Sequence, residues 1–256
     1  MVQIPMKTSG PLNRQTILSI NQKRVQRPAT SQTILASNTS KPLCDTASQR
    51  PTQTTVQPAP IIRDPILQKP IPQLIHPMQK GQKLSLESKG PLSKIKACLG
   101  WNVTNNACDV DVSAFLLNAD GKVLGDSWFV FYGQEQSPDK STVFFTDSGA
   151  DLEIISVDLQ KLNTQVKKMV FVLTIHEALE KHLNFSMIKD AYIRIIDQTS
   201  NQELASFQMD EYYSNVTSMM IGELYQHNHI WKFNAIGNGV ARDLAGLCEL
   251  YSVSVI

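Results

Sequence analysis

The stretch Leu99–Leu117, LGWNVTNNACDVDVSAFLL, is the part of the chain that decides the fold. Its second half alternates between apolar and polar residues, which predicts a β-strand with one face against a core. The apolar face carries Val110, Val112, Ala114 and Leu116. The opposite face carries Asp109, Asp111 and Ser113. The two carboxylates therefore lie about 6 to 7 Å apart at the start of the strand.

Two neighbouring carboxylates repel each other. At an effective dielectric constant of about 20, the repulsion between Asp109 and Asp111 costs about 2 kcal/mol. A shared cation or strong hydrogen-bond donors would compensate for this cost. The pair therefore indicates a site that contains a positive partner, and the strand alone leaves the nature of that partner open.

The composition divides the chain at about residue 80. All Phe, Trp and Tyr residues follow residue 80, whereas 11 of the 13 prolines precede it. Residues 1–80 contain ten Lys and Arg against two Asp, and residues 81–256 contain 14 basic and 21 acidic residues. Residues 1–78 bury too little apolar surface to fold by themselves, so we expect a disordered basic tail followed by an acidic domain over residues 79–256. Within this tail, Pro58–Pro77 is predicted to be a polyproline II spacer or a groove ligand.

The four cysteines show no CxxC pair and no zinc-site spacing, which favours reduced thiols in a cytoplasmic protein. No segment has the roughly 18 continuous apolar residues of a membrane span, and the N-terminus has no apolar signal region. We expect a cytoplasmic location. The basic tail is a candidate for contact with protein partners or with an anionic membrane surface, and no feature indicates a specific nucleic-acid ligand.

Short alternating segments separated by turn residues continue to the end of the chain. They favour a two-sheet antiparallel β-sandwich. The predicted strands are 83–87, 95–101, 110–117, 128–132, 142–146, 153–159, 168–175, 191–197, 203–209, 217–225 and 230–235. A short crossover helix is predicted over Glu177–His182, and a C-terminal helix that caps the sandwich over Gly239–Tyr251.

Of the nine carboxylates between residues 109 and 153, eight form a set that falls mostly in loops or at strand ends. They are Asp109, Asp111, Asp120, Asp126, Asp139, Asp147, Asp151 and Glu153. Oxygen ligands in loops suit Ca²⁺ better than Mg²⁺ or Zn²⁺. The alternative is a solvated acidic rim of turn-forming aspartates, and composition alone does not separate the two.

A series of ordered motifs resembles the TerD family of bacterial tellurium-resistance and stress-response proteins. The resemblance covers about residues 78–256. Its motifs are Lys80-Gly81, LGW at 99–101, DxDxSAFLL at 109–117, GKV at 121–123, FVFY at 129–132, SPD at 137–139, VDL at 157–159, LTIH at 173–176, GELYxH at 222–227 and WKF at 231–233. The resemblance implies a calcium-binding β-sandwich whose ligands come from the DxD strand and from an acidic loop before the VDL strand.

The carry-over of calcium ligands is partial. The implied metal ligands are Asp109 and Asp111 of the DxD pair, Asp139 of the SPD loop, Asp147 of the shortened acidic loop, and Asp151 and Glu153 of the acidic triplet. Leu152 takes the middle position of that triplet, and Asn102 stands where an Asp commonly follows the LGW motif. Each change removes an oxygen or a charge, so the residues are compatible with one weakened calcium site or with none.

These observations lead to a non-enzymatic stress-response protein with a calcium-binding acidic edge. Two alternatives keep the same fold: a metal-free scaffold or interaction module, and a calcium-dependent membrane-docking protein. A zinc site at His227-x-His229 lacks an identifiable third ligand. The sequence contains no GxSxG, P-loop or GxGxxG motif, which disfavours the common enzyme classes.

Overall fold

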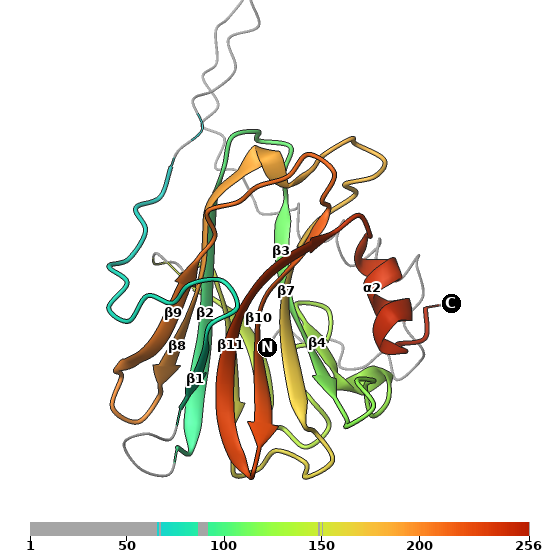
Figure 1. Cartoon of the computed structure of the whole chain (residues 1–256). Helices are drawn as coiled ribbons and strands as arrows, with labels where there is room; N and C mark the ends of the chain where they lie inside the picture. The colour runs from blue at the N-terminus through green and yellow to red at the C-terminus, as the bar shows by residue number, and fades with distance from the viewer. Residues whose placement is uncertain (1–65, 67, 87–91, 148, 150, 256) are drawn as a thin grey trace, which may run out of the picture.

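The computed structural model describes residues 66, 68–86, 92–147, 149 and 151–255. These residues form two antiparallel sheets packed face to face, as predicted (Figure 1). The six-stranded sheet has the order β1 (Lys83–Ser85), β11 (Ile230–Val240), β10 (Ser218–His227), β7 (Lys168–Ile175), β3 (Val110–Leu117) and β4 (Phe129–Phe131). The five-stranded sheet has the order β5 (Thr142–Thr146), β6 (Glu153–Asp158), β2 (Lys94–Val103), β8 (Ile188–Asp197) and β9 (Glu203–Gln208).

Strand β3 follows the predicted alternation, but both of its faces are buried. Its apolar face, with Val112 and Leu116, belongs to the main core between the sheets. On the other face, Phe115 and Leu117 form a second core with Phe129 and other residues beneath the C-terminal helix. The polar residues of that face are buried as well, since Asp111 is only 6% exposed. β3 is thus covered on both faces, although only β4 separates it from the edge of its sheet.

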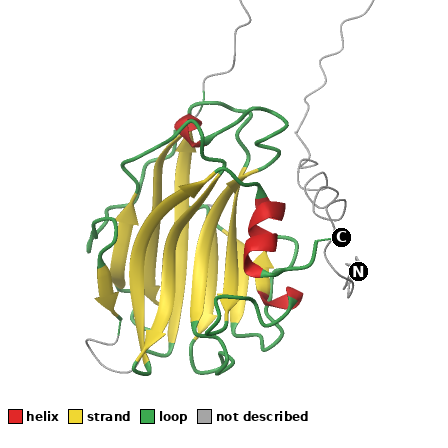
Figure 2. Cartoon of the chain, turned by 45° about the vertical axis from the view of Figure 1, so that its right-hand side comes forward, coloured by secondary structure: helices red, strands yellow, loops and turns green. Residues whose placement is uncertain are grey.

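The C-terminal helix α2 (Leu244–Tyr251) is shorter than predicted. It covers the outer face of the six-stranded sheet (Figure 2). The predicted start at Gly239 is wrong, because β11 continues to Val240. The side chain of Asp243 caps the helix by accepting a hydrogen bond from the N–H of Gly246 at 2.9 Å. Pairing with β10 extends β11 into residues whose periodicity alone indicated a helix.

The predicted crossover helix at Glu177–His182 is absent, and these described residues form turns. Glu177 and His182 both have positive φ angles, 52° and 53°, which a right-handed helix does not allow. A single i to i+4 hydrogen bond joins the N–H of Lys181 to the carbonyl of Glu177. Elsewhere in the described part of the chain there are two short 3-10 helices, η1 (Asp126–Trp128) and η2 (Phe185–Met187).

Residues 68–78, here called the strap, lie against the five-stranded sheet rather than apart from the domain (Figure 1). The N–H of Met78 donates to the carbonyl of Ser206 at 2.7 Å, and the N–H of Ser206 donates to the carbonyl of His76 at 2.9 Å. These two bonds add a short parallel bridge to the edge of β9. The ordered contacts thus begin before the predicted domain boundary at residue 78. The rest of the predicted tail, residues 1–65, lies outside the described residues, as does Leu67.

Within the described residues, no helix combines the length and apolar character that a membrane span requires. Cys98, Cys108 and Cys248 are free and buried. Cys44 lies outside the described residues.

Candidate functional site

The first residues of β3 and of β6 lie at the same end of the sandwich. We call it the acidic end, because it carries Asp109, Asp111, Asp147, Asp151 and Glu153. Glu153, the first residue of β6, pairs with Leu99 on one side and Thr146 on the other. Its side chain is only 2% exposed, and Oε2 accepts a hydrogen bond from the N–H of Val112 at 2.7 Å. β4 pairs with β3 only from Ser113 onward. The carboxylate of Glu153 therefore accepts the hydrogen bond of a backbone N–H, that of Val112, which precedes the paired residues. Glu153 therefore ties the two sheets together.

Asp151, just before β6, is bound to two residues of β8. Its Oδ1 accepts hydrogen bonds from the Tyr192 hydroxyl at 3.1 Å and from Arg194 Nε at 3.2 Å. Its Oδ2 accepts a second hydrogen bond from Arg194, through Nη2. The guanidinium and the carboxylate thus form a bidentate ion pair, and both side chains are largely buried. A protein cation already neutralises this member of the predicted calcium site.

Burial and the Asp151–Arg194 ion pair together shift the pKa values of Arg194, Cys98 and Tyr192. Burial alone would lower the pKa of Arg194, but the hydrogen bond and charge of Asp151 outweigh burial and raise it. Burial, reinforced by the charge of Asp151, raises the pKa of Cys98 to about 12. The same two causes raise the pKa of Tyr192. Arg194 therefore stays charged, while Cys98 and Tyr192 stay neutral at physiological pH.

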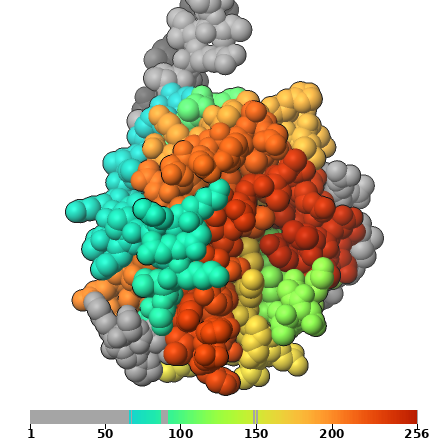
Figure 3. Space-filling view, in the orientation of Figure 1, coloured from blue at the N-terminus to red at the C-terminus, as the bar shows by residue number. Residues whose placement is uncertain are grey.

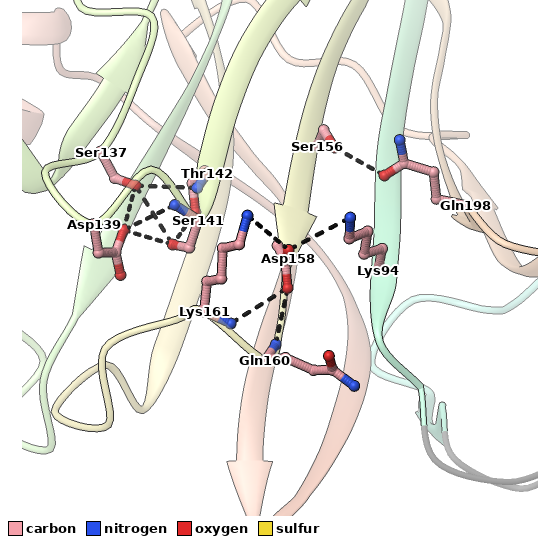
Figure 4. Close-up of polar contacts among 10 residues, drawn as sticks. All are labelled: Lys94, Ser137, Asp139, Ser141, Thr142, Ser156, Asp158, Gln160, Lys161 and Gln198. Atoms are coloured by element: carbon pink, nitrogen blue, oxygen red, sulfur yellow. Dashed lines mark hydrogen bonds and ion pairs between the residues drawn. The ribbon is translucent and has the colours of Figure 1, made fainter.

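Asp139 lies at the other end of the β5–β6 hairpin. Thr142 pairs with Val157, whereas Thr146 pairs with Glu153, so about 13 Å of strand separates the two ends. Asp139 Oδ1 accepts hydrogen bonds from the Ser137 hydroxyl and from the hydroxyl and N–H of Ser141 (Figure 4). Its Oδ2 accepts one from the N–H of Asn163 at 2.8 Å. This carboxylate organises a loop and is not brought together with Asp151 and Glu153.

The electrostatics of Asp139 agree with this structural role. Burial on its own would raise the pKa of Asp139, but the hydrogen bonds from Ser137, Ser141 and Asn163 outweigh burial and lower it. Asp158 nearby behaves similarly. Burial would raise the pKa of Asp158, but backbone N–H groups and the charge of Lys94 outweigh burial and lower it (Figure 4). Both aspartates are stabilised as anions by protein donors.

The remaining predicted ligands lie at the acidic end. Asp109 is exposed, and its carbonyl accepts a hydrogen bond from the N–H of His176 at 2.7 Å. Asp111 is buried and pairs across the sheet with Thr174. Asp147 is exposed in the turn after β5, and its N–H donates to the carbonyl of Leu152 at 3.0 Å. Leu152 is half-buried, so its exposure does not distinguish a calcium loop from a metal-free turn.

These six residues do not fit a preformed calcium cage. Asp139 is at the wrong end, both oxygens of Asp151 bind Arg194, and one oxygen of Glu153 binds a backbone N–H. Across the described part of the chain, no three or more His, Cys, Asp or Glu side chains are grouped so that they could hold a metal ion. Calcium binding by the acidic end stays a prediction.

His227 and His229 are exposed residues at the turn between β10 and β11. His229 and the intervening Asn228 both have positive φ angles, 63° and 51°. The turn places the two imidazoles at the tip of the hairpin. Among the described residues, they are not part of any group of three or more His, Cys, Asp or Glu side chains that could hold a metal ion.

Sequence reasoning missed the residues that neutralise and connect the acidic end. Tyr192 and Arg194 alternate along β8, so the period of two could have placed them on one face. For Asn102, the family motif indicates only the loss of an aspartate. In the structure, Asn102 Oδ1 accepts a hydrogen bond from the N–H of Lys69 at 2.8 Å. Its Nδ2 donates hydrogen bonds to the carbonyl of Lys69 at 2.9 Å and to Asp190 Oδ2 at 3.0 Å.

Comparison with known proteins now adds to this geometry. The TerD domain model matches residues 74–251. Tellurium resistance protein TerD of Serratia marcescens is 36% identical over 186 residues, which cover 69% of this chain and 97% of that protein. The chain belongs to the TerD family. This membership confirms the resemblance seen in the sequence motifs.

Other TerD relatives are named for stress responses. General stress protein 16U of Bacillus subtilis (strain 168) is 37% identical over 188 residues, which cover 70% of this chain and 97% of that protein. The protein thus resembles tellurium-resistance and stress-response proteins of the TerD family. A crystal structure of a homologue of telluride resistance protein (TerD) from Streptomyces coelicolor A3(2) is 16% identical, with a TM-score of 0.48. That match covers 65% of this chain and 100% of the other.

Proposed function

We propose that this TerD-family protein is a non-enzymatic stress-response protein whose sandwich serves as an interaction module and needs no calcium to fold. One observation carries this proposal: Arg194 binds both carboxylate oxygens of Asp151, a residue that the family resemblance assigned to calcium. A divalent cation that recruited Asp151 would have to displace this guanidinium. The displaced Arg194, 16% exposed in its side chain, would lose the partner that offsets its burial.

The thiols support the non-enzymatic part of the proposal. A cysteine nucleophile needs a lowered pKa and an accessible sulfur. Burial, with the charges of nearby aspartates, raises the pKa of Cys98 and that of Cys248 to about 12. Burial raises the pKa of Cys108 as well. All three thiols are therefore held in the unreactive protonated form.

Calorimetric titration of the full-length protein with CaCl₂ tests the proposal. We expect no saturable heat and no change in the midpoint of thermal unfolding. A saturable heat that disappears in the double variant Asp109→Ala, Asp111→Ala would overturn the metal-free proposal. In that case, calcium at 100 times its Kd would stabilise the fold by about 2.7 kcal/mol.

A variant of Arg194 sharpens this test. Arg194→Gln removes the competing cation, so we expect it to acquire a calcium response that the wild-type protein lacks. Arg242→Gln is the matched control, because Arg242 is an exposed arginine whose guanidinium donates to the carbonyl of Gly246 at 3.3 Å. An equal response of the two variants would show that Arg194 does not govern cation binding.

Calcium binding at the remaining carboxylates is the second candidate function. Its support is the position of Asp109 and Asp147, which are both exposed at the end where Asp111 and Glu153 lie. Oxygen ligands from loops suit calcium at low affinity. If calcium binding is the function, titration of the wild-type protein with CaCl₂ should give a saturable heat. Asp147→Asn should then weaken calcium binding, and Asp139→Asn should leave the affinity for calcium unchanged.

A further inference from the structure

A cavity of about 330 Å³ opens between the strap and the edges of the two sheets. Residues 76–78 of the strap form one wall, Leu84 and Leu86 form a second, and Glu203 and Leu204 of β9 form a third. In Figure 1 the strap passes from the side of β9 toward β1, and Figure 3 shows it on the molecular surface at that edge. The cavity therefore exists because the strap is docked, and its volume is in the range of small-molecule sites.

Glu203 gives this cavity a buried carboxylate. The side chain is 2% exposed, and its Oε1 accepts hydrogen bonds from the N–H groups of Ile75 at 2.8 Å and His76 at 2.9 Å. Its Oε2 is buried and has no hydrogen-bond partner within the described part of the chain. Arg194 Nη1 lies 3.7 Å from this oxygen, which is too far for a hydrogen bond.

Arg194 also leaves the local charge unbalanced. Its guanidinium makes two hydrogen bonds to Asp151 and only the longer contact to Glu203. One positive charge thus faces two carboxylates. This local excess of negative charge favours a ligand that brings a positive charge.

We propose that this cavity binds a small organic cation. The ammonium group pairs by charge with the carboxylate of Glu203 in the cavity wall, and a short apolar chain packs against Met78, Leu84 and Leu86. Met78 and Leu86 are buried and Leu84 is half-buried, so the walls offer the apolar contact that such a chain needs. Arg194 lies between this cavity and the acidic end, but Glu203 is not one of the residues implied as calcium ligands, so binding of the organic cation does not depend on calcium.

Hexylammonium chloride is a suitable probe, and 1-hexanol is its neutral counterpart of similar length. Both are titrated into full-length, ¹⁵N-labelled protein while backbone amide shifts are followed. We expect hexylammonium to shift the amides of Leu84, Leu86 and Leu204 in a saturable manner. The alcohol should bind at least tenfold more weakly, because it carries no charge to pair with Glu203.

Substitution of the carboxylate separates charge recognition from apolar binding. Glu203→Gln retains an acceptor for the strap N–H groups but removes the negative charge, so we expect at least a tenfold loss of hexylammonium affinity. Unchanged hydrogen exchange at Ile75 and His76 would show that the strap remains docked in this variant. Glu249→Gln, on the exposed side of α2, is the matched control and should bind like the wild type.

Two outcomes would overturn the proposal. Equal binding of hexylammonium and hexanol would show an apolar groove without charge recognition. The absence of saturable shifts at residues 84, 86 and 204 would show that the cavity takes up no organic cation. Neither outcome depends on calcium titration, so this inference and the proposed function fail independently.

Discussion

The side-chain amide of Asn102 pairs with the backbone of Lys69 through two hydrogen bonds, of 2.8 and 2.9 Å. The same Nδ2 group donates to Asp190. Asn102 is 7% exposed, so these bonds form away from bulk water. This pairing holds the first part of the strap at the end of β2, while Glu203 and Ser206 hold its last part along β9.

Asn102→Asp is expected to release the first part of the strap. The substitution replaces the Nδ2 donor by a carboxylate oxygen that faces both the Lys69 carbonyl and Asp190. A lost buried hydrogen bond with added repulsion costs about 1–3 kcal/mol. Hydrogen exchange should accelerate at Lys69, and chemical denaturation should report the destabilisation. Asn106→Asp, at an exposed loop position nearby, is the control and should change neither.

Asp139→Asn is expected to destabilise the protein by about 2 kcal/mol at pH 7, because hydrogen bonds to a charged acceptor are stronger than those to a neutral one. The pKa of Asp139 in the folded protein lies below the ordinary value of 3.8. Its contribution to stability is thus fully present above that value and is lost as the pH falls through the lower folded pKa.

The pH dependence of the Asp139→Asn effect tests whether the charge of Asp139 is its cause. The difference in unfolding free energy between the wild type and Asp139→Asn should shrink below pH 3.8. Asp120→Asn, in the exposed turn after β3, should differ little from the wild type at any pH. If the effect of Asp139→Asn stayed constant into acid, that result would contradict the anionic role of Asp139.

Gly100 is expected to tolerate no side chain. A Cβ atom at this position would overlap the ring of Tyr192, whose hydroxyl binds Asp151. Gly100→Ala should therefore push Tyr192 away from Asp151 and lower the free energy of unfolding by about 1–3 kcal/mol. Tyr192→Phe keeps the ring and removes only the hydroxyl. If Gly100→Ala proved no more destabilising than Tyr192→Phe, close packing at this position would be of little importance.

The basic N-terminal residues are expected to bind anionic lipid without calcium. Residues 1–65 contain eight Lys and Arg and two Asp, and each basic residue near such a surface contributes about 1 kcal/mol. Full-length protein should sediment with vesicles of about 30% phosphatidylserine in phosphatidylcholine, and added salt should weaken this binding. A variant without residues 1–65 should stay in the supernatant. Binding that required calcium would instead support a calcium bridge.

Local patterns were sufficient to predict most of the strands. Alternation along 110–117 and 168–175 matches β3 and β7 residue for residue, because the side chains of a strand alternate between two faces. The C-terminal helix was predicted at the right place in the chain, but its predicted start at Gly239 is too early, since β11 continues through Val240 by pairing with β10. The 177–182 segment failed as a helix because two of its residues adopt positive φ angles.

The candidate site was predicted less well than the fold. The family resemblance implied that Asp139, Asp151 and Glu153 would meet at one calcium site, but antiparallel pairing of β5 and β6 places Asp139 at the opposite end. The counter-charge for Asp151 comes from Arg194, 43 residues away in sequence. Such a partner cannot be read from spacing, because strand register decides which residues meet.

The sequence by itself determined the sandwich, its family and the Asp109–Asp111 pair, since periodicity, turn residues and motifs are local properties of the chain. Only the tertiary structure decided that both faces of β3 are buried, that Arg194 neutralises Asp151 and that the strap docks through Asn102 and Glu203. These three features depend on which distant residues meet across strands and sheets. Burial then makes each of those meetings energetically important, because a charged or polar group removed from water must find its partner within the protein.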